Sequence, residues 1–157
     1  MQFISLIGGL FSLAVFWHFV ADWFPQSHQE AMTKTRDPEV RAWHCLKYTL
    51  IFMIPVIWVG LGGPGWLGFV NAIILCSTHY VIDSYVPVLL WAKYLRKHPT
   101  FAFSTHHDGS ERAFTDKEAF KEMALTPIGL ILIITMDQLF HIAALIPVVV
   151  LIALYAL

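Results

Sequence analysis

The fold prediction begins from the segment Trp17-His18-Phe19-Val20-Ala21-Asp22. This segment places a histidine and an aspartate four residues apart inside an otherwise apolar stretch. The same spacing recurs in His79 with Asp83 and in Asp137 with His141. Residues i and i+4 lie on one face of an α-helix, a turn apart. Three apolar helices are therefore each predicted to carry a His/Asp face, and the rest of the chain is the scaffold that brings these faces together.

The composition is typical of a membrane protein. The chain has 157 residues, of which 57% are hydrophobic and 13% are charged, and its mean hydropathy is +0.64. Soluble domains usually have about 25% charged residues. We therefore expect a lipid bilayer as the main partner. We expect no nucleic-acid partner, because no basic face is interleaved with exposed aromatic residues.

Four apolar stretches approach or exceed the roughly 20 residues that a membrane span needs. We predict an all-α fold, namely an integral membrane bundle of four transmembrane helices with a cytoplasmic helical loop, in one domain over residues 1–157. The last stretch is long enough that it must tilt, kink at Pro147 or protrude. The predicted spans are residues 3–23, 38–60, 66–91 and 127–155, and the loops are 24–37 and 92–126.

Local signals predict where several helices begin and end. Ser27-x-x-Glu30 and Thr115-x-x-Glu118 have the capping-box spacing, which predicts one short helix in each loop. Asp37 followed by Pro38 is typical of the first residues of a helix, here the second span. The run Leu61-Gly62-Gly63-Pro64-Gly65 predicts a tight turn between the second and third spans.

The positive charges predict the orientation. All ten Lys and Arg residues lie in or beside the two loops 24–37 and 92–126. By the positive-inside rule these loops are cytoplasmic, so both termini lie outside. The tryptophans agree, because Trp23, Trp43 and Trp91 mark one predicted interface while Trp58 and Trp66 mark the other.

The ionisable residues of the spans fall in one half of the predicted bundle. His18 and Asp22 lie in the last turns of the first span, and His44 lies at the start of the second. If the third span continues to Trp91, Asp83 lies about 12 Å below that interface at the usual helical rise. All four spans are therefore predicted to supply polar groups near the cytoplasmic side.

Such residues are costly in a bilayer. One intramembrane Asp costs about 2.5–3.5 kcal/mol on insertion scales, and three cost on the order of 7–10 kcal/mol if unpaired. We expect mutual pairing, a cation, or both. Imidazole and carboxylate ligands suit Zn²⁺, Mn²⁺ or Fe²⁺, and the set is large enough for one or two ions. The predicted metal ligands are His18, Asp22, His44, His79, Asp83, Asp137 and His141.

Further roles follow from the same positions. A carboxylate of Asp22, Asp83 or Asp137 that is not used as a ligand is the predicted catalytic base. Gln26 and Gln138 are placed to supply outer hydrogen bonds to the first and last His/Asp pairs. We predict that Lys47, one turn after His44, holds an anionic substrate group. The two cysteines, Cys45 and Cys76, fall at different depths and are expected to form neither a disulfide nor a metal cage.

These motifs resemble a family of small bacterial and phage membrane proteins that is catalogued as a domain of unknown function. The resemblance rests on His18-Phe-Val-Ala-Asp22 with Gln26, on His44 opening a span, on Thr78-His-Tyr-Val-Ile-Asp83 and on Met136-Asp-Gln-Leu-Phe-His141. It covers most of the chain except about residues 93–124. It implies a bacterial inner-membrane protein, and in style it is similar to membrane-bound metal-dependent hydrolases. Ser84 follows Asp83 where this family often has a lysine, so no role is carried over from that lysine.

Three functions remain open at this point. The first is a metal-dependent hydrolase that takes a lipid or another amphiphilic or anionic small substrate from the cytoplasmic leaflet. The second is a proton, metal-ion or solute translocator that uses the same His/Asp residues, and with four spans it would have to form a homo-oligomer. The third is a non-catalytic membrane partner protein, in which the polar residues only fix helix register.

Overall fold

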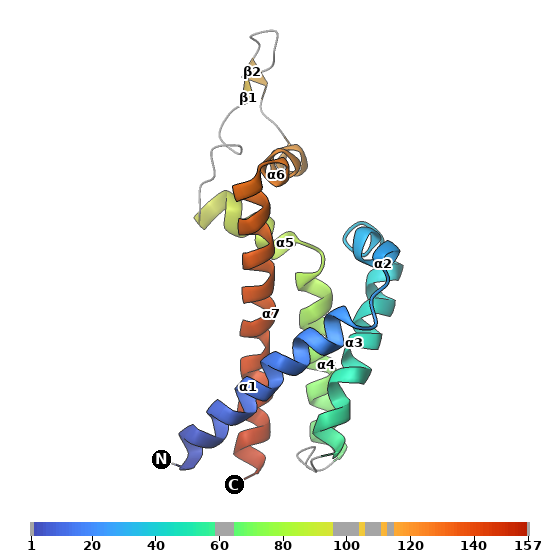
Figure 1. The fold of residues 1–157 in the computed structure, drawn as a ribbon, viewed down its shortest axis with the longest axis vertical. Helices are drawn as coiled ribbons and strands as arrows, with labels where there is room; N and C mark the ends of the chain where they lie inside the picture. The colour runs from blue at the N-terminus through green and yellow to red at the C-terminus, as the bar shows by residue number, and fades with distance from the viewer. Residues whose placement is uncertain (1, 59–64, 96–103, 106–110, 113–114, 157) are drawn as a thin grey trace. The chain divides into compact units, whose positions relative to one another are not determined.

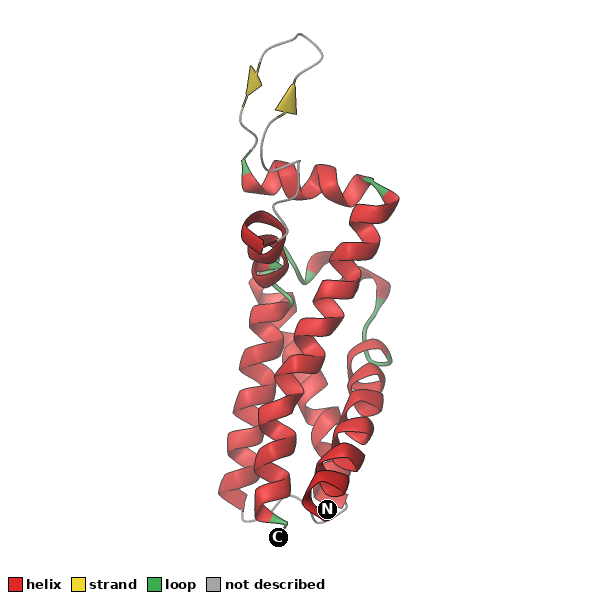
Figure 2. Cartoon of the chain, turned by 90° about the vertical axis from the view of Figure 1, so that its left-hand side faces the viewer, coloured by secondary structure: helices red, strands yellow, loops and turns green. Residues whose placement is uncertain are grey.

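The computed structural model describes residues 2–58, 65–95, 104–105, 111–112 and 115–156. Helices make up nearly all of the described chain (Figure 2), which confirms the predicted all-α fold. A single antiparallel pair of two-residue strands, β1 with β2, interrupts the helices among the described residues. The elements are α1 (Gln2–Trp23), α2 (His28–Thr33), α3 (Pro38–Trp58), α4 (Gly65–Ile82), α5 (Val86–Leu90), the π-helical η1 (Trp91–Leu95), β1 (Ser104–Thr105), β2 (Glu111–Arg112), α6 (Asp116–Leu125) and α7 (Pro127–Tyr155).

Four of these helices are long and apolar enough to cross a membrane, so the chain is a multi-pass membrane protein. α3 and α7 continue through Pro55 and Pro147 as single helices. A proline inside a membrane helix is tolerated where neighbouring groups satisfy the freed carbonyl. The segments that meet the criterion are Phe3–Trp23, Pro38–Ile57, Gly65–Ile82 and Pro127–Tyr155.

The third span is shorter than predicted. α4 ends at Ile82, whereas the sequence predicted one helix as far as Trp91. Tyr85 adopts a left-handed backbone conformation with φ 58°, which no helix can accommodate. Pro87 lacks the N–H that would bond back to residue 83, and its ring disfavours helical geometry before it. The depth inferred for Asp83 assumed a continuous helix to Trp91, which the structure does not have.

The structure divides into two compact units, which are described separately: residues 1–84 with 140–157, and residues 85–139. In the first unit α3 packs along α4, and α1 crosses α3 at an angle (Figure 1). The guanidinium of Arg41 lies 4.6 Å from the ring centroid of Tyr80, which links α3 to α4 by a cation–π contact. The apolar core of this unit comprises Ala14, Ala21, Tyr48, Phe52, Val56, Leu75, Leu145, Val148, Val149 and Ile152.

α1 is held along a narrow stripe. Its buried residues are Ala14, His18, Ala21 and Asp22, at spacings of four, three and one. This spacing keeps them on one helical face, and the two alanines let the backbone approach its neighbours closely. Large apolar side chains such as Phe16, which is 63% exposed, cover the opposite side. α1 therefore offers one polar stripe to the protein and an apolar surface to lipid.

In the second unit, the capping box predicted at Thr115 is confirmed. Thr115 and Glu118 cap the start of α6 reciprocally. Lys93 of η1 forms a 2.8 Å ion pair with Asp116, and this carboxylate holds the pKa of Lys93 above its ordinary value. The ring of Tyr85 packs 6.0 Å from that of Phe120. These contacts join the two sides of the second loop.

The cap predicted for the first short helix is half right. Ser27 caps α2 by accepting a hydrogen bond from the Glu30 N–H, as expected. The Glu30 carboxylate turns instead toward α3, where Lys47 donates a hydrogen bond to it. The glycine-rich turn predicted at 61–65 lies almost wholly outside the described residues, which resume at Gly65.

Candidate metal centre

His44, in the second turn of α3, is the centre of a buried polar cluster. It is fully buried, and its Nε2 atom lies 2.9 Å from Asp22 Oδ1 of α1 and 3.1 Å from His79 Nε2 of α4. Asp83 Oδ2, just after α4, is 3.4 Å away. Two segments far apart in the sequence, α1 and the end of α4, therefore converge on one imidazole nitrogen of α3.

The His79/Asp83 pair behaves as its spacing predicted. His79 Nε2 and Asp83 Oδ2 are 3.4 Å apart, one turn along the chain. The last α-helical hydrogen bond of α4 runs from Asp83 N–H to the His79 carbonyl. Asp83, whose carboxylate enters the cluster, is thus the first residue after the helix. Both side chains are 2% exposed.

His18 and His141 complete the cluster in the first unit. His18 Nδ1 lies 3.1 Å from the hydroxyl of Tyr48, and its ring stacks 5.2 Å from that of His141. His141 Nε2 is 3.6 Å from Asp83 Oδ1. The Tyr48 ring stacks on His79 with centroids 3.8 Å apart, which fixes the plane of that imidazole. Tyr48 follows His44 by one helical turn. This spacing could have predicted that Tyr48 also faces the cluster.

Lys34 is the cluster residue that sequence reasoning missed most clearly. It is the C-cap of α2, and its side chain is 12% exposed. Its Nζ lies 3.1 Å from Asp83 Oδ1, 3.1 Å from His44 Nε2 and 3.6 Å from Asp22 Oδ1. The sequence had suggested only a loop charge on the cytoplasmic side. The available signal was the i, i+4 spacing of Glu30 and Lys34 on one short helix.

Glu30 was also missed as a cluster neighbour. Its Oε1 lies 3.2 Å from His44 Nδ1, within ion-pair distance but without hydrogen-bond alignment. Metal-binding histidines usually direct their second ring nitrogen at a carboxylate or carbonyl, which orients the ring. Glu30 occupies that place behind His44. Lys47, predicted to hold an anionic group, is paired with Glu30 and remains partly exposed.

The remaining predicted residues have different surroundings. Asp137 belongs to the second unit, where it accepts a 3.1 Å hydrogen bond from Gln138. Its place in the ligand set stays a prediction from helical spacing. The Gln26 amide nitrogen is buried with no hydrogen-bond partner among the described residues.

Cys45 lies beside the cluster, although two thiols had been discounted as metal ligands. It is fully buried, and it offers its sulfur within 4.8 Å of ligand atoms of His79 and Asp83. Asp22, His44 and His79 form a second such group. Cys45 and Cys76 are both free thiols. In the sequence, Cys45 is notable only because it follows His44. Neighbouring residues on a helix point in different directions, so this position did not predict that Cys45 faces the cluster.

The hydrogen-bond count around His44 Nε2 shows what the site can do. One imidazole nitrogen carries at most one proton, so it donates once or accepts once. Here it meets two carboxylate oxygens, a second imidazole nitrogen and an ammonium, all within 3.4 Å. Protons alone cannot satisfy all these contacts. A buried cluster of this donor set can hold a divalent metal ion.

Comparisons with known proteins give a family and no activity. A family model described as "Protein of unknown function (DUF3307)" matches residues 10–156. No curated protein and no solved structure matches the chain.

Proposed function

The chain belongs to this family of unknown function, DUF3307, and we propose that it is a membrane-embedded metal-binding protein that acts as a metal-dependent hydrolase on a lipid or other amphiphile. One observation carries the proposal: four ligand atoms from three segments lie next to each other in a buried place. They are Asp22 Oδ1, His44 Nε2, His79 Nε2 and Asp83 Oδ2.

The spacing of three of these atoms, Asp22 Oδ1, His44 Nε2 and His79 Nε2, fits a tetrahedral ion. Nitrogen and oxygen ligands lie about 2.0–2.1 Å from zinc, so neighbouring ligand atoms in a tetrahedron are about 3.3–3.4 Å apart. The three separations among these atoms are 2.9, 3.1 and 3.5 Å, and the fourth position of a tetrahedron is left for water or for Asp83.

The donor set favours zinc, manganese or iron, in one or two ions. A second ion would use His141, whose Nε2 lies 3.6 Å from Asp83 Oδ1, and His18, whose ring stacks on that of His141. Asp137 is the proposed seventh ligand. Cys45 is a further candidate, and a thiolate at that place would favour zinc over manganese.

The charge balance favours an anionic substrate. Asp22 and Asp83 carry two negative charges, and Lys34 offsets one of them. A divalent ion would turn the remaining single negative charge into a single positive one. That positive charge would attract a phosphate or carboxylate group, and Lys34 and Lys47 lie on the side of the cluster that faces α2.

The proposed chemistry is hydrolysis. Asp22, His44 and His79 could hold a divalent ion, which would lower the pKa of a nearby water molecule and polarise the bond to be cleaved. A carboxylate of Asp22, Asp83 or Asp137 that does not bind the ion would take a proton from water, and the water oxygen would form a bond to the phosphorus or carbonyl carbon. The bond to the leaving oxygen breaks, and the carboxyl group returns the proton to that oxygen. Atoms and charges balance with water as the only co-reactant.

We place the site at the cytoplasmic leaflet of a bacterial inner membrane, in one membrane domain with both termini outside. The positive charges beside residues 24–37 and 92–126 support this orientation. Trp23 and Trp43, both about 60% exposed at the same side of the first unit, suit the interface there. The cluster lies at the adjoining helix ends, so a substrate would enter from the inner leaflet.

The direct test is elemental analysis of protein purified without added metal, followed by assays of phospholipid and lipid-phosphate hydrolysis before and after chelation. We expect about one or two equivalents of a transition metal, and activity that chelator removes and metal restores. Protein without stoichiometric transition metal, together with activity that chelator leaves unchanged, would overturn the proposal.

One observation favours a second candidate, the translocation of protons or metal ions. Asn71 is fully buried in α4, two turns before His79, and neither atom of its amide has a hydrogen-bond partner among the described residues. It extends the polar face of α4 away from the cluster, as a transit path requires. Flux into proteoliposomes that Asp83→Asn abolishes would support this candidate. A flat trace for protons and divalent ions would exclude it.

A further inference from the structure

The thiol of Cys45 lies on the face of α3 that packs along α4. Cys45 is fully buried, whereas the next residue, Leu46, is 42% exposed. Arg41, one turn earlier, makes the cation–π contact with Tyr80 of α4, and Thr49, one turn later, is buried as well. Positions four apart share one face of a helix. The thiol is therefore held toward α4 and away from lipid.

Two buried ligand groups of α4 and its end face this thiol. Cys45, His79 and Asp83 each offer one ligand atom, and these three atoms lie within 4.8 Å of one another. Asp83 Oδ2 and His79 Nδ1 are buried, and neither has a hydrogen-bond partner among the described residues. Buried polar atoms normally have such a partner. A metal ion would supply one, because it accepts electron pairs from sulfur, nitrogen and oxygen alike.

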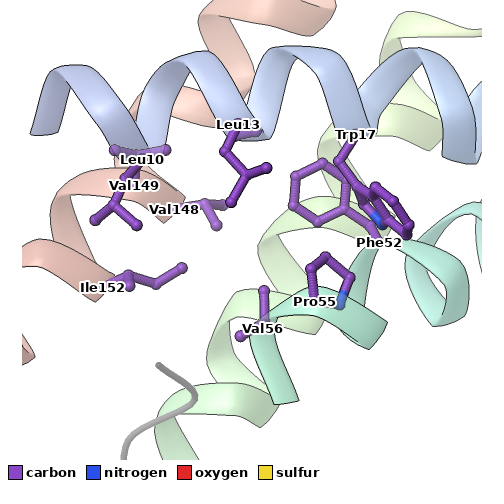
Figure 3. A pocket seen from close by; sticks show the side chains of 10 residues that line it. Leu10, Leu13, Trp17, Phe52, Pro55, Val56, Val148, Val149 and Ile152 are labelled. Carbon is purple, nitrogen blue, oxygen red and sulfur yellow. The ribbon is translucent and has the colours of Figure 1, made fainter. Parts of the chain in front are cut away.

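Further along the same face of α3, ligand groups give way to apolar packing. Phe52 lies two turns after Cys45, and Figure 3 shows it with Val56, with Trp17 of α1 and with Val148 of α7. These side chains border a gap of only about 40 Å³. Aliphatic and aromatic side chains offer a metal ion no lone pair, and the indole nitrogen is a donor only. Cys45 is therefore at the end of this face where an ion would find ligands.

We infer that Cys45 binds a metal ion as a thiolate, together with His79 and Asp83, and that this ligand makes zinc the resident metal. The inference rests on the proposed metal-binding function and narrows its metal from three candidates to one. His79 also belongs to the group formed with Asp22 and His44, so the thiolate position adjoins that one.

A thiolate changes which metals a site retains. Manganese and magnesium prefer carboxylate, carbonyl and water oxygens, whereas zinc binds sulfur well. A thiol that coordinates a metal ion loses its proton. Each ion bound would therefore form one sulfur–metal bond and release one proton from Cys45 to solvent, with no change of oxidation state.

A buried cysteine can also serve only as a small apolar side chain. Serine at the same position separates the two roles, because it has nearly the same size but lacks the sulfur. Packing alone predicts a loss of stability that is independent of metal, whereas a ligand role predicts a loss of zinc affinity. Cys76 provides the matched control, because it is a free, partly buried thiol of α4 that belongs to neither ligand group.

The first test loads the full-length, detergent-solubilised protein with Co²⁺ and records its absorption spectrum. A thiolate bound to Co²⁺ gives an intense charge-transfer band in the near ultraviolet, which nitrogen and oxygen ligands do not give. We expect this band in the wild-type protein and in Cys76→Ser, and its loss in Cys45→Ser. Wild-type protein that binds Co²⁺ without the band, or a band that only Cys76→Ser removes, would overturn the inference.

Competition between Zn²⁺ and Mn²⁺ measures the selectivity. Cys45→Ser should lower the affinity for Zn²⁺ at least about 100-fold, because losing a ligand costs no less than losing its outer partner. It should change the affinity for Mn²⁺ less than about threefold, and Cys76→Ser should change neither. Equal losses for both metals in Cys45→Ser would contradict a selective thiolate.

X-ray absorption of zinc-loaded Cys76→Ser decides the case in which Cys45→Ser does not fold. We expect sulfur at about 2.3 Å from zinc in that variant, and nitrogen and oxygen ligands alone would overturn the inference.

The outcomes also separate this inference from the proposed function. Protein that binds metal through nitrogen and oxygen alone loses the thiolate and keeps the metal-dependent hydrolase. Protein that shows the charge-transfer band but hydrolyses no lipid loses the hydrolase and keeps the zinc–thiolate site. Protein that binds no metal loses both, and elemental analysis identifies this case.

Discussion

The Nε2 atoms of His44 and His79 lie 3.1 Å apart, although 35 positions separate the two residues. Two neutral imidazoles can share one proton at this distance, but Asp22 and Lys34 compete for the same atom of His44. A common cation relieves the competition, because each nitrogen then directs its lone pair at the ion.

This pair gives the first prediction. His44→Ala or His79→Ala should lower metal affinity at least about 100-fold, since even the loss of an outer partner costs about 10–100-fold. Elemental analysis after dialysis measures it. His28→Ala is the matched control, because His28 is exposed on α2. Equal metal content in all three variants would place the ion elsewhere.

Metal should also stabilise the fold. A ligand at 100 times its dissociation constant adds about 2.7 kcal/mol to the free energy of unfolding, which corresponds to about 5–10 °C for a chain of this size. Thermal melts of detergent-solubilised protein, with chelator and then with added Zn²⁺ or Mn²⁺, measure the shift. The double variant His44→Ala/His79→Ala should show none, and a full shift in that variant would contradict a cluster-bound ion.

Lys34 should be energetically coupled to Asp83, since their charged atoms are 3.1 Å apart and nearly buried. Removing one partner of a buried pair leaves the other uncompensated and costs about 3–5 kcal/mol. Asp83→Ala and Lys34→Met should each destabilise the metal-free protein, and the double variant should lose less than the sum. A double-mutant cycle by denaturant unfolding is expected to give a coupling of about 0.5–3 kcal/mol. Additive losses would mean that the pair does not form in the membrane.

Two glycines should respond oppositely to alanine. At Gly129, early in α7, an added Cβ would lie 1.9 Å from the Met123 carbonyl oxygen and 2.6 Å from Thr126 Oγ1. Gly129→Ala should therefore cost about 1–3 kcal/mol of stability through overpacking at the α6–α7 turn. Gly8 has open space around it in α1, so Gly8→Ala should stabilise by about 0.5–1 kcal/mol through reduced backbone entropy. Thermal melts of both variants measure the contrast, and equal shifts would contradict it.

Periodicity predicted the helical part of the cluster. The spacing of His18 with Asp22 and of His79 with Asp83 put each pair on one face. The structure brings Asp22, His79 and Asp83 to His44, and it places the His18 ring 6.1 Å from the ring of His79. Helical spacing predicts which side chains share a face because it depends only on residues within one turn of each other. The four residues of these pairs and His44 were expected to be buried in the protein, because exposing their polar side chains to lipid costs free energy.

Other contacts were beyond the same reasoning. Lys34 reaches the cluster because α2 folds back on α3. The presence of a charged residue in a loop does not predict which part of the protein that loop packs against. The Glu30 carboxylate could either cap the start of α2 or contact another helix. In the structure it accepts a hydrogen bond from Lys47 of α3. Pro87 was a visible break signal after Asp83, but membrane helices often tolerate proline, so its effect depended on the left-handed Tyr85.

The narrow buried stripe of α1 has a consequence for biosynthesis. His18 and Asp22 are translated before His44, His79 and Asp83, so the first helix enters the membrane with its carboxylate unmatched. Until the later helices arrive, Asp22 costs up to about 2.5–3.5 kcal/mol in the bilayer. We expect the nascent first helix to stay beside the insertion machinery until α4 has been made, and to dock last.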